Sequence, residues 1–151
     1  MHLDLPLELH FVDLGKGQSR TPEFLALNPN GRTPVLTDGN FVLWESNAIM
    51  QYLASQRPNA LWPDDARTRA DVSRWQFWEG AHWDPACSVY LFENLVKPHI
   101  LKAGEPDQAA LAKGAEAFHR CATVLNNHLK GKKFITGEKI TALGAALDAP
   151  G

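Results

Sequence analysis

The sequence predicts a chain of two parts, a small α/β unit followed by an all-helical unit. Short alternating or apolar segments, separated by turn residues, fill the first part, whereas long helical periodicities fill the second. Between them lies a stretch with two prolines and several turn residues, which is typical of a linker. We therefore expect a first domain at residues 1–57, a linker at 58–65 and a second domain at 66–151.

The chain has 151 residues, of which 44% are hydrophobic and 21% are charged, as is usual for globular proteins. A net charge of −2 gives no electrostatic footprint for nucleic acid or for an anionic membrane. Because there is no apolar run near the roughly 20 residues of a membrane span, and no signal-peptide pattern at the start, we expect a cytoplasmic protein. Cys87 and Cys121 lack metal-ligand spacing, and we expect both to be small buried residues.

The first domain is expected to run strand, helix, strand, strand, helix. Residues 7–13 alternate apolar and polar side chains, which predicts a strand. Thr21 precedes Pro22 and an apolar segment ending at Leu27, a pattern typical of a capped helix. The turn residues of Asn28-Pro-Asn-Gly31 then end this helix.

A hairpin and a helix follow. Residues 33–36 and 41–44 are apolar runs joined by Thr37-Asp-Gly-Asn40, and Asp-Gly between such runs favours a hairpin. Ser46 then opens a helix that extends to about Ser55.

The second domain is expected to be helical throughout. A Trp-rich helix at residues 67–83 is expected to break or kink near Asp84-Pro85, to resume at residue 87 and to end by Lys97, before Pro98. Residues 107–129 predict an amphipathic helix. Its apolar positions recur every three or four residues: Leu111, Ala115, Phe118, Ala122, Leu125 and Leu129. A short apolar element at 134–137 and an Ala/Gly-rich tail at 141–151 complete the chain.

Three linked segments carry a specific resemblance. Asn28-Pro-Asn-Gly-Arg-Thr-Pro-Val-Leu36, Asp38-Gly39 and Leu43-Trp-Glu-Ser-Asn-Ala-Ile49 closely resemble the glutathione-binding half of glutathione transferases. Leu61-Trp-Pro63 and Arg74-Trp-Gln-Phe-Trp-Glu79 look like the linker and first long helix of bacterial members of the family, which resemble the theta, phi and beta classes. The resemblance covers about residues 5–140.

This resemblance implies the glutathione transferase fold, with an incomplete thioredoxin-like α/β N-terminal domain and an all-α helical-bundle C-terminal domain. It also implies a homodimer that uses glutathione as co-substrate and adds its thiol to small electrophilic substrates, as in detoxification. We expect no nucleic-acid, membrane or metal partner.

The Glu45-Ser46 pair is the first candidate element of a glutathione site. Ser46 opens a helix, where free backbone N–H groups and the helix dipole favour a carboxylate. Glu45 can accept a hydrogen bond from the α-ammonium group of the ligand. In the family this pair holds the γ-glutamyl group. The alternative is that Ser46 is only an N-cap, which any helix favours.

Thr33-Pro34 is the second candidate element. A proline that opens a strand indicates an edge position or a cis peptide bond. In the family this proline is cis, and the backbone of the preceding residue pairs with the cysteinyl part of glutathione, a role that falls to Thr33. A plain turn proline is the alternative. By the same resemblance, Arg32 and Arg20, with Ser19 as a weaker candidate, serve the glycyl carboxylate, although each arginine could be a solvated surface residue.

The second-substrate pocket would come from the helical domain. Trp78, His82, Trp83 and Tyr90 lie along the helix that faces the thiol in family members. Aromatic residues at helical spacing are more often core than pocket, and we favour the core interpretation.

Both ends depart from the family pattern. Family members lower the pKa of the bound thiol with a Ser, Tyr or Cys near the chain start, but no such residue occurs before Ser19, so we assign no catalytic residue. Near the other end, Gly144 follows Thr141 where the family carries an acidic capping residue. We therefore expect a chain truncated at both ends. A non-catalytic binding or interaction module, or an inactive fragment, is the alternative function.

Overall fold

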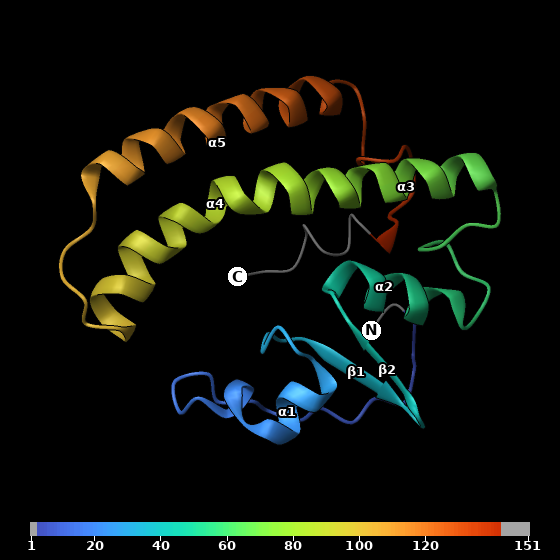
Figure 1. The fold of residues 1–151 in the computed structure, drawn as a ribbon. Coiled ribbons are helices and arrows are strands. Elements are labelled where there is room, and N and C mark those ends of the chain that lie inside the picture. The colour runs from blue at the N-terminus through green and yellow to red at the C-terminus, as the bar shows by residue number, and fades with distance from the viewer. Residues whose placement is uncertain (1–2, 143–151) are drawn as a thin grey trace. The chain divides into compact units, whose positions relative to one another are not determined.

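The computed structural model describes residues 3–142 and divides the chain into two compact units, with the division between Pro63 and Asp64 (Figure 1). The first unit is α/β and the second is helical, which confirms the predicted fold class. The exact domain bounds, 1–57 and 66–151 around a linker at 58–65, stay a proposal. Among the described residues, no helix is long and apolar enough to cross a membrane.

The first unit contains the predicted hairpin. Strands β1 (Val35–Asp38) and β2 (Phe41–Trp44) pair antiparallel, with Val35 opposite Trp44 and Asp38 opposite Phe41. Gly39 opens the two-residue turn between them with a φ of 57°, a conformation that glycine adopts without steric cost. β1 begins two residues later than predicted, because Pro34 has no N–H to donate to a partner strand.

Three short helices complete the regular secondary structure described in this unit. They are η1 (Gln18–Arg20), α1 (Pro22–Leu27) and α2 (Ser46–Ser55). The predicted cap of α1 is confirmed, since the Thr21 hydroxyl accepts a hydrogen bond from the backbone N–H of Phe24 at 3.3 Å. α2 buries Ile49 and Ala54 on its apolar side.

The predicted strand at residues 7–13 is wrong. Within the described chain the sheet consists of β1 and β2 alone, so this segment has no neighbouring strand with which to form a ladder. Its apolar side chains are not covered either, because Leu9 is 86% and Phe11 is 88% exposed. Alternation indicates a strand only where a partner and a buried face exist.

In the second unit, the helix that was expected to break or kink near Asp84-Pro85 does not break there. Helix α3 (Ala66–Trp78) continues through a π-helical segment, η2 (Glu79–Trp83), into α4 (Asp84–Leu91). Pro85 lies in the first turn of α4, directly after the widened π turn. A local π segment re-routes the hydrogen bonds around a proline, so the helix changes its winding instead of ending.

The predicted helix end at Lys97 is also wrong. A second π-helical segment, η3 (Phe92–Ile100), follows α4 and contains Pro98. The wide winding extends to its last residues, where the N–H of Leu101 donates to the carbonyl of Val96 at 2.8 Å. A residue that cannot donate an i→i−4 hydrogen bond is tolerated here because the segment already uses longer bonds.

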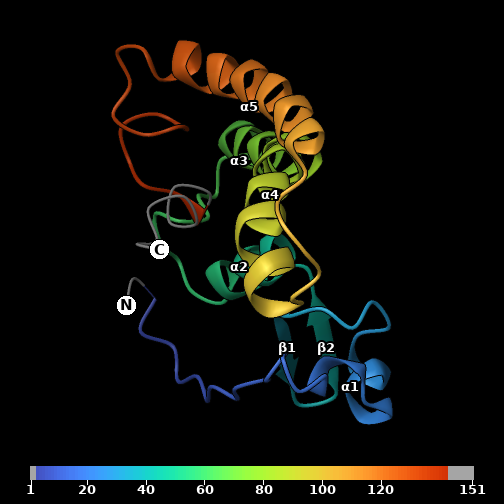
Figure 2. The ribbon, with the colours of Figure 1, turned by 90° about the vertical axis from the view of Figure 1, so that its left-hand side faces the viewer.

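Helix α5 (Gln108–Leu129) lies alongside α4 and confirms the long amphipathic helix (Figure 2). Asp107 caps it, accepting from the N–H groups of Ala109 and Ala110 at 2.8 and 3.1 Å. The six predicted apolar positions are only half-buried, and the buried line runs through Gly114 and Cys121 instead. Sequence periodicity found the correct helix but placed the buried face slightly off centre.

The two cysteines differ in burial. Cys121 is buried, as predicted, and its Sγ lies 3.6 Å from the carbonyl oxygen of His82. Cys87 is only half-buried, so the prediction is wrong for this residue. Partial burial raises the pKa of the Cys87 thiol and keeps it protonated at neutral pH.

The segment after α5 forms a small antiparallel bridge between Phe134 and Gly137. Thr141 is buried, and its hydroxyl lies 2.8 Å from that of Thr136. The Ala/Gly-rich tail from residue 143 onward, with Gly144, lies outside the described residues.

Candidate functional site

The register of the hairpin brings the two candidate motifs together. Val35 is the first residue of β1 and pairs with Trp44, the last residue of β2. Thr33-Pro34 directly precedes β1 and Glu45-Ser46 directly follows β2, so both pairs lie at the same end of the hairpin. Because α2 begins at Ser46, this end also carries the N-terminus of a helix.

Glu45 has an unusual backbone. Its φ of 74° and ψ of 115° fall outside the regions that residues with a Cβ favour. Such conformations cost about 1–3 kcal/mol and concentrate at ligand-binding positions. Its carboxylate makes no capping bond to α2 and is exposed, so it is available to a ligand. Nothing in the sequence pattern indicated this strain.

Ser46 is the first residue of α2 and not its N-cap, since Glu45 occupies that position. The alternative that Ser46 is a plain N-cap is therefore wrong. The first turn of α2 contains no acidic residue, and Ser46 is exposed. The first N–H groups of a helix lack partners within the helix, so this end of α2 can bind an anion.

A cis peptide bond joins Thr33 to Pro34, as expected, and both residues are exposed. The turn before them is held by Asn28, which is only 2% exposed. Its side-chain amide donates to the carbonyl of Arg32 at 2.7 Å, and its Oδ1 accepts from the backbone N–H of Asn30 at 3.0 Å. The sequence indicated a turn at Asn28 but not this anchoring role.

The two candidate arginines lie near the same turn. Arg32 is exposed, and Arg20 donates from Nη1 to the carbonyl of Asn30 at 3.3 Å. A Cβ on Gly31, whose φ is 60°, would lie 2.9 Å from the backbone carbonyl oxygen of Ser19, so this turn requires glycine. Ser19 is buried, which weakens it as a ligand-binding candidate.

The aromatic candidates of the helical unit contact one another. The rings of Trp78 and Trp83 stack with centroids 6.1 Å apart, and Trp83 and Tyr90 both contact Phe118 of α5. His82 is exposed, with its ring 6.5 Å from that of Trp78. These contacts favour the core interpretation for the tryptophans and the tyrosine.

One aromatic residue of this cluster was missed. Trp75 is buried, and its ring centroid lies 4.2 Å from that of His128. His128 in turn lies 2.7 Å from the carbonyl of Ile135, which ties α3, α5 and the segment after α5 together. The spacing of three residues between Trp75 and Trp78 places both on one face of α3, and this spacing could have indicated that Trp75 belongs to the aromatic cluster.

Comparison with known proteins gives one consistent family. The family model "Glutathione S-transferase, N-terminal domain" matches residues 1–55. Glutathione S-transferase 3 of Zea mays is 38% identical over 144 residues, which cover 93% of this chain and 64% of that protein. Glutathione S-transferase theta-1 of Homo sapiens is 34% identical, with 91% of this chain and 58% of the relative covered. The chain therefore spans somewhat less than two thirds of these relatives.

A solved structure agrees with these relatives. Human glutathione transferase theta-2, in complex with glutathione and an unknown ligand, matches with a TM-score of 0.85 and 31% identity, covering 96% of this chain and 61% of that one. Together with the hairpin, the cis proline and the helix that opens at Ser46, these matches show that the chain belongs to the glutathione S-transferase family.

Proposed function

We propose that this chain binds glutathione at the open end of its hairpin and serves the conjugation of the glutathione thiol to small electrophilic substrates. The observation that carries the proposal is the register of β1 with β2. It gathers Thr33, Pro34, Glu45 and Ser46 around the N-terminus of α2. Membership of the family supports glutathione as the ligand.

The γ-glutamyl end of glutathione carries one α-carboxylate and one α-ammonium group. We assign the carboxylate to the Ser46 hydroxyl and the first N–H groups of α2, where the helix dipole favours a negative charge. The ammonium group pairs with the free carboxylate of Glu45. The two residues are adjacent, as the two groups are on one carbon of the ligand.

The remaining two parts of glutathione fall to the strand that enters the hairpin. The exposed Thr33 offers its backbone N–H and carbonyl to the cysteinyl unit, beside the cis Pro34. Arg32 and Arg20, which donates to the carbonyl of Asn30 in the same turn, supply positive charge for the glycyl carboxylate. A guanidinium can bind a carboxylate through two parallel hydrogen bonds.

In the reaction, the glutathione thiolate attacks an electrophilic carbon and forms a C–S bond. A leaving group departs with its electron pair, or the electrons of a polarised double bond are displaced and then protonated. The residues above bind and orient glutathione. We assign no residue of this chain to activation of the thiol.

Calorimetric titration of the whole chain with glutathione tests the site. We expect Ser46→Ala to weaken binding about tenfold, since hydrogen bonds to charged groups contribute about 1.5–3 kcal/mol. Ser55→Ala is the matched control. Ser55 lies at the other end of α2 and donates to the carbonyl of Tyr52, so this variant should bind like the parent. Equal affinity of Ser46→Ala and the parent, or no binding by the parent, would show the site to be wrongly assigned.

Turnover of chlorodinitrobenzene with glutathione tests the enzymatic part. Conjugate formation above the uncatalysed rate, reduced in Ser46→Ala, is the expected result. Binding without turnover would instead support a non-catalytic binding module. We further propose a homodimer in the cytoplasm. Light scattering on the eluting protein and fractionation of the source cells test these two statements.

A further inference from the structure

Asn30-Gly31 is the only place in the sequence where glycine follows asparagine. Asparagine is a thermolabile residue, because the backbone nitrogen of the next residue can attack its side-chain amide. A following glycine favours this attack, since it has no Cβ to hinder the approach. Asn30 is also exposed, so water reaches its side chain.

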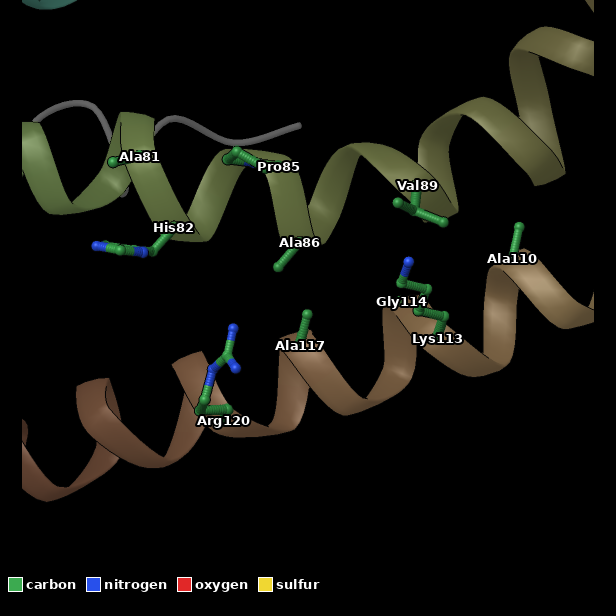
Figure 3. A pocket seen from close by; sticks show the side chains of 10 residues that line it. All are labelled: Ala81, His82, Pro85, Ala86, Val89, Ala110, Lys113, Gly114, Ala117 and Arg120. Carbon is green, nitrogen blue, oxygen red and sulfur yellow. The ribbon is translucent and has the colours of Figure 1, made fainter.

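Other asparagines of the chain have less reactive neighbours. Asn28 precedes a proline, whose nitrogen carries no hydrogen and cannot attack. Asn94 lies within η3 and Asn126 within α5, where helical hydrogen bonds hold the next backbone N–H. The groove between the η2–α4 region and α5 has no asparagine in its lining (Figure 3). Asn30 is thus distinguished by both its neighbour and its exposure.

Asn28 restrains both reacting groups of this pair. The backbone N–H of Gly31, which contains the attacking nitrogen, donates to the carbonyl of Asn28 at 2.9 Å. The side-chain amide of Asn30, which contains the leaving nitrogen, donates to Oδ1 of Asn28 at 3.0 Å. Gly31 is buried, so solvent base does not reach its nitrogen. The reaction therefore requires this turn to open, and the hydrogen bonds of Asn28 oppose the opening.

We propose that Asn30 is a site of spontaneous deamidation whose rate Asn28 controls. The Gly31 nitrogen loses its proton to solvent and forms a bond to Cγ of Asn30. The Cγ–Nδ2 bond then breaks, and Nδ2 takes up a proton and leaves as ammonia. Water opens the resulting succinimide ring. Hydrolysis at Cγ gives aspartate, whereas hydrolysis at the backbone carbonyl carbon gives isoaspartate, which adds a methylene to the main chain.

Either product places a negative charge beside the candidate arginines. In isoaspartate the new carboxylate is the former backbone carbonyl of residue 30, whose oxygen accepts a hydrogen bond from Nη1 of Arg20 at 3.3 Å. Arg20 is then paired within the chain, and Arg32 is two residues away in sequence. Deamidation therefore weakens glutathione binding. This consequence rests on the proposed glutathione site, whereas the reaction itself does not.

Peptide mapping by mass spectrometry tests the modification, on the whole chain incubated in mildly alkaline buffer. Asn30 should convert before Asn40 and Asn59, which precede residues with a Cβ and serve as internal controls. Asn28→Ala should convert Asn30 about tenfold faster than the parent, since two hydrogen bonds to Oδ1 are lost. The parent unfolded in urea should also convert faster, and this comparison requires no variant to fold. A folded parent that converts Asn30 as fast as Asn28→Ala or the unfolded chain, or that converts Asn40 first, would overturn the proposal.

Calorimetric titration with glutathione tests the consequence, on deamidated chain separated by anion exchange. We expect about tenfold weaker binding than by the unmodified chain, since the carboxylate competes for the hydrogen bonds of Arg20. Asn40→Asp is the matched control, because it adds the same charge at the turn end of the hairpin, and it should bind like the parent. Equal affinity of the deamidated and unmodified chains would overturn the effect on the site. No binding by the unmodified chain would overturn the proposed function, while the mapping decides the deamidation independently.

Discussion

The carboxylate of Glu93, in the first turn of η3, accepts a hydrogen bond from the backbone N–H of Asp107 at 2.7 Å. Asp107 is itself the N-cap of α5. The same carboxylate pairs with Lys97 at 2.8 Å and is nearly buried. One side chain therefore links the first turn of η3 to the start of α5, across a connection with no regular structure.

This arrangement predicts a pH dependence of stability. The hydrogen bond from Asp107, and then the hydrogen bond from Lys97 with its charge, hold the pKa of Glu93 below its ordinary value. Stability from a lowered carboxyl pKa is present above the unfolded pKa of about 4.3 and is lost as the pH falls through the folded pKa. Glu93→Gln should therefore lower the urea midpoint at pH 7, with the difference from the parent shrinking toward pH 3.

The control for Glu93 is Glu105→Gln, an exposed glutamate with no ion pair in the described part of the chain. Its urea midpoint should follow that of the parent at every pH. A constant difference between Glu93→Gln and the parent from pH 7 to pH 3 would contradict the role of the charge.

The close approach of α5 to α4 at Gly114 predicts a steric penalty. Gly114→Val places new atoms against Val89, and overpacking of this kind costs about 1–3 kcal/mol. Gly80→Val is the matched control, since a Cβ at Gly80 meets nothing within 4 Å. Urea unfolding followed by circular dichroism compares the two. If both variants unfold at the same midpoint, the helices are not packed as closely as described.

Asn28 should be important for both stability and binding. Asn28→Ala removes the hydrogen bonds to the carbonyl of Arg32 and from Asn30, at a cost of about 1–3 kcal/mol for the pair. Since this turn positions Arg32 and Thr33, glutathione affinity should fall as well. Asn30→Ala removes only the side-chain amide that donates to Oδ1 of Asn28. It should therefore have a smaller effect on stability and on glutathione affinity than Asn28→Ala. Calorimetry and thermal unfolding on the two variants give the comparison.

Tyr52 links α2 to β1, because its hydroxyl donates to Oδ2 of Asp38 at 2.6 Å. This hydrogen bond raises the pKa of Tyr52, and burial and the Asp38 charge add to it. The stabilisation is complete below the unfolded tyrosine pKa of about 10 and is lost as the pH rises through the higher folded value. In an absorbance titration at alkaline pH, Asp38→Asn should ionise Tyr52 at lower pH than the parent. An unchanged titration would show that the hydrogen bond is not formed in solution.

Local chemistry in the sequence determined several elements of this protein correctly. Thr21 with Pro22, Asp-Gly at 38–39 and the spacing from Leu111 to Leu129 each specify an element through interactions within a few residues. The Glu45-Ser46 and Thr33-Pro34 motifs were also recognisable, because their residue types match the chemistry of one ligand.

Only the tertiary structure decided the remaining features. The alternation at residues 7–13 could form a strand only with a partner, and the described chain offers none. Pro85 and Pro98 did not end the continuous helix from α3 to η3, because π-helical segments re-routed its hydrogen bonds. The strain at Glu45 and the anchoring by Asn28 depend on the backbone geometry of the folded chain. Such features arise from packing, which a linear pattern does not record.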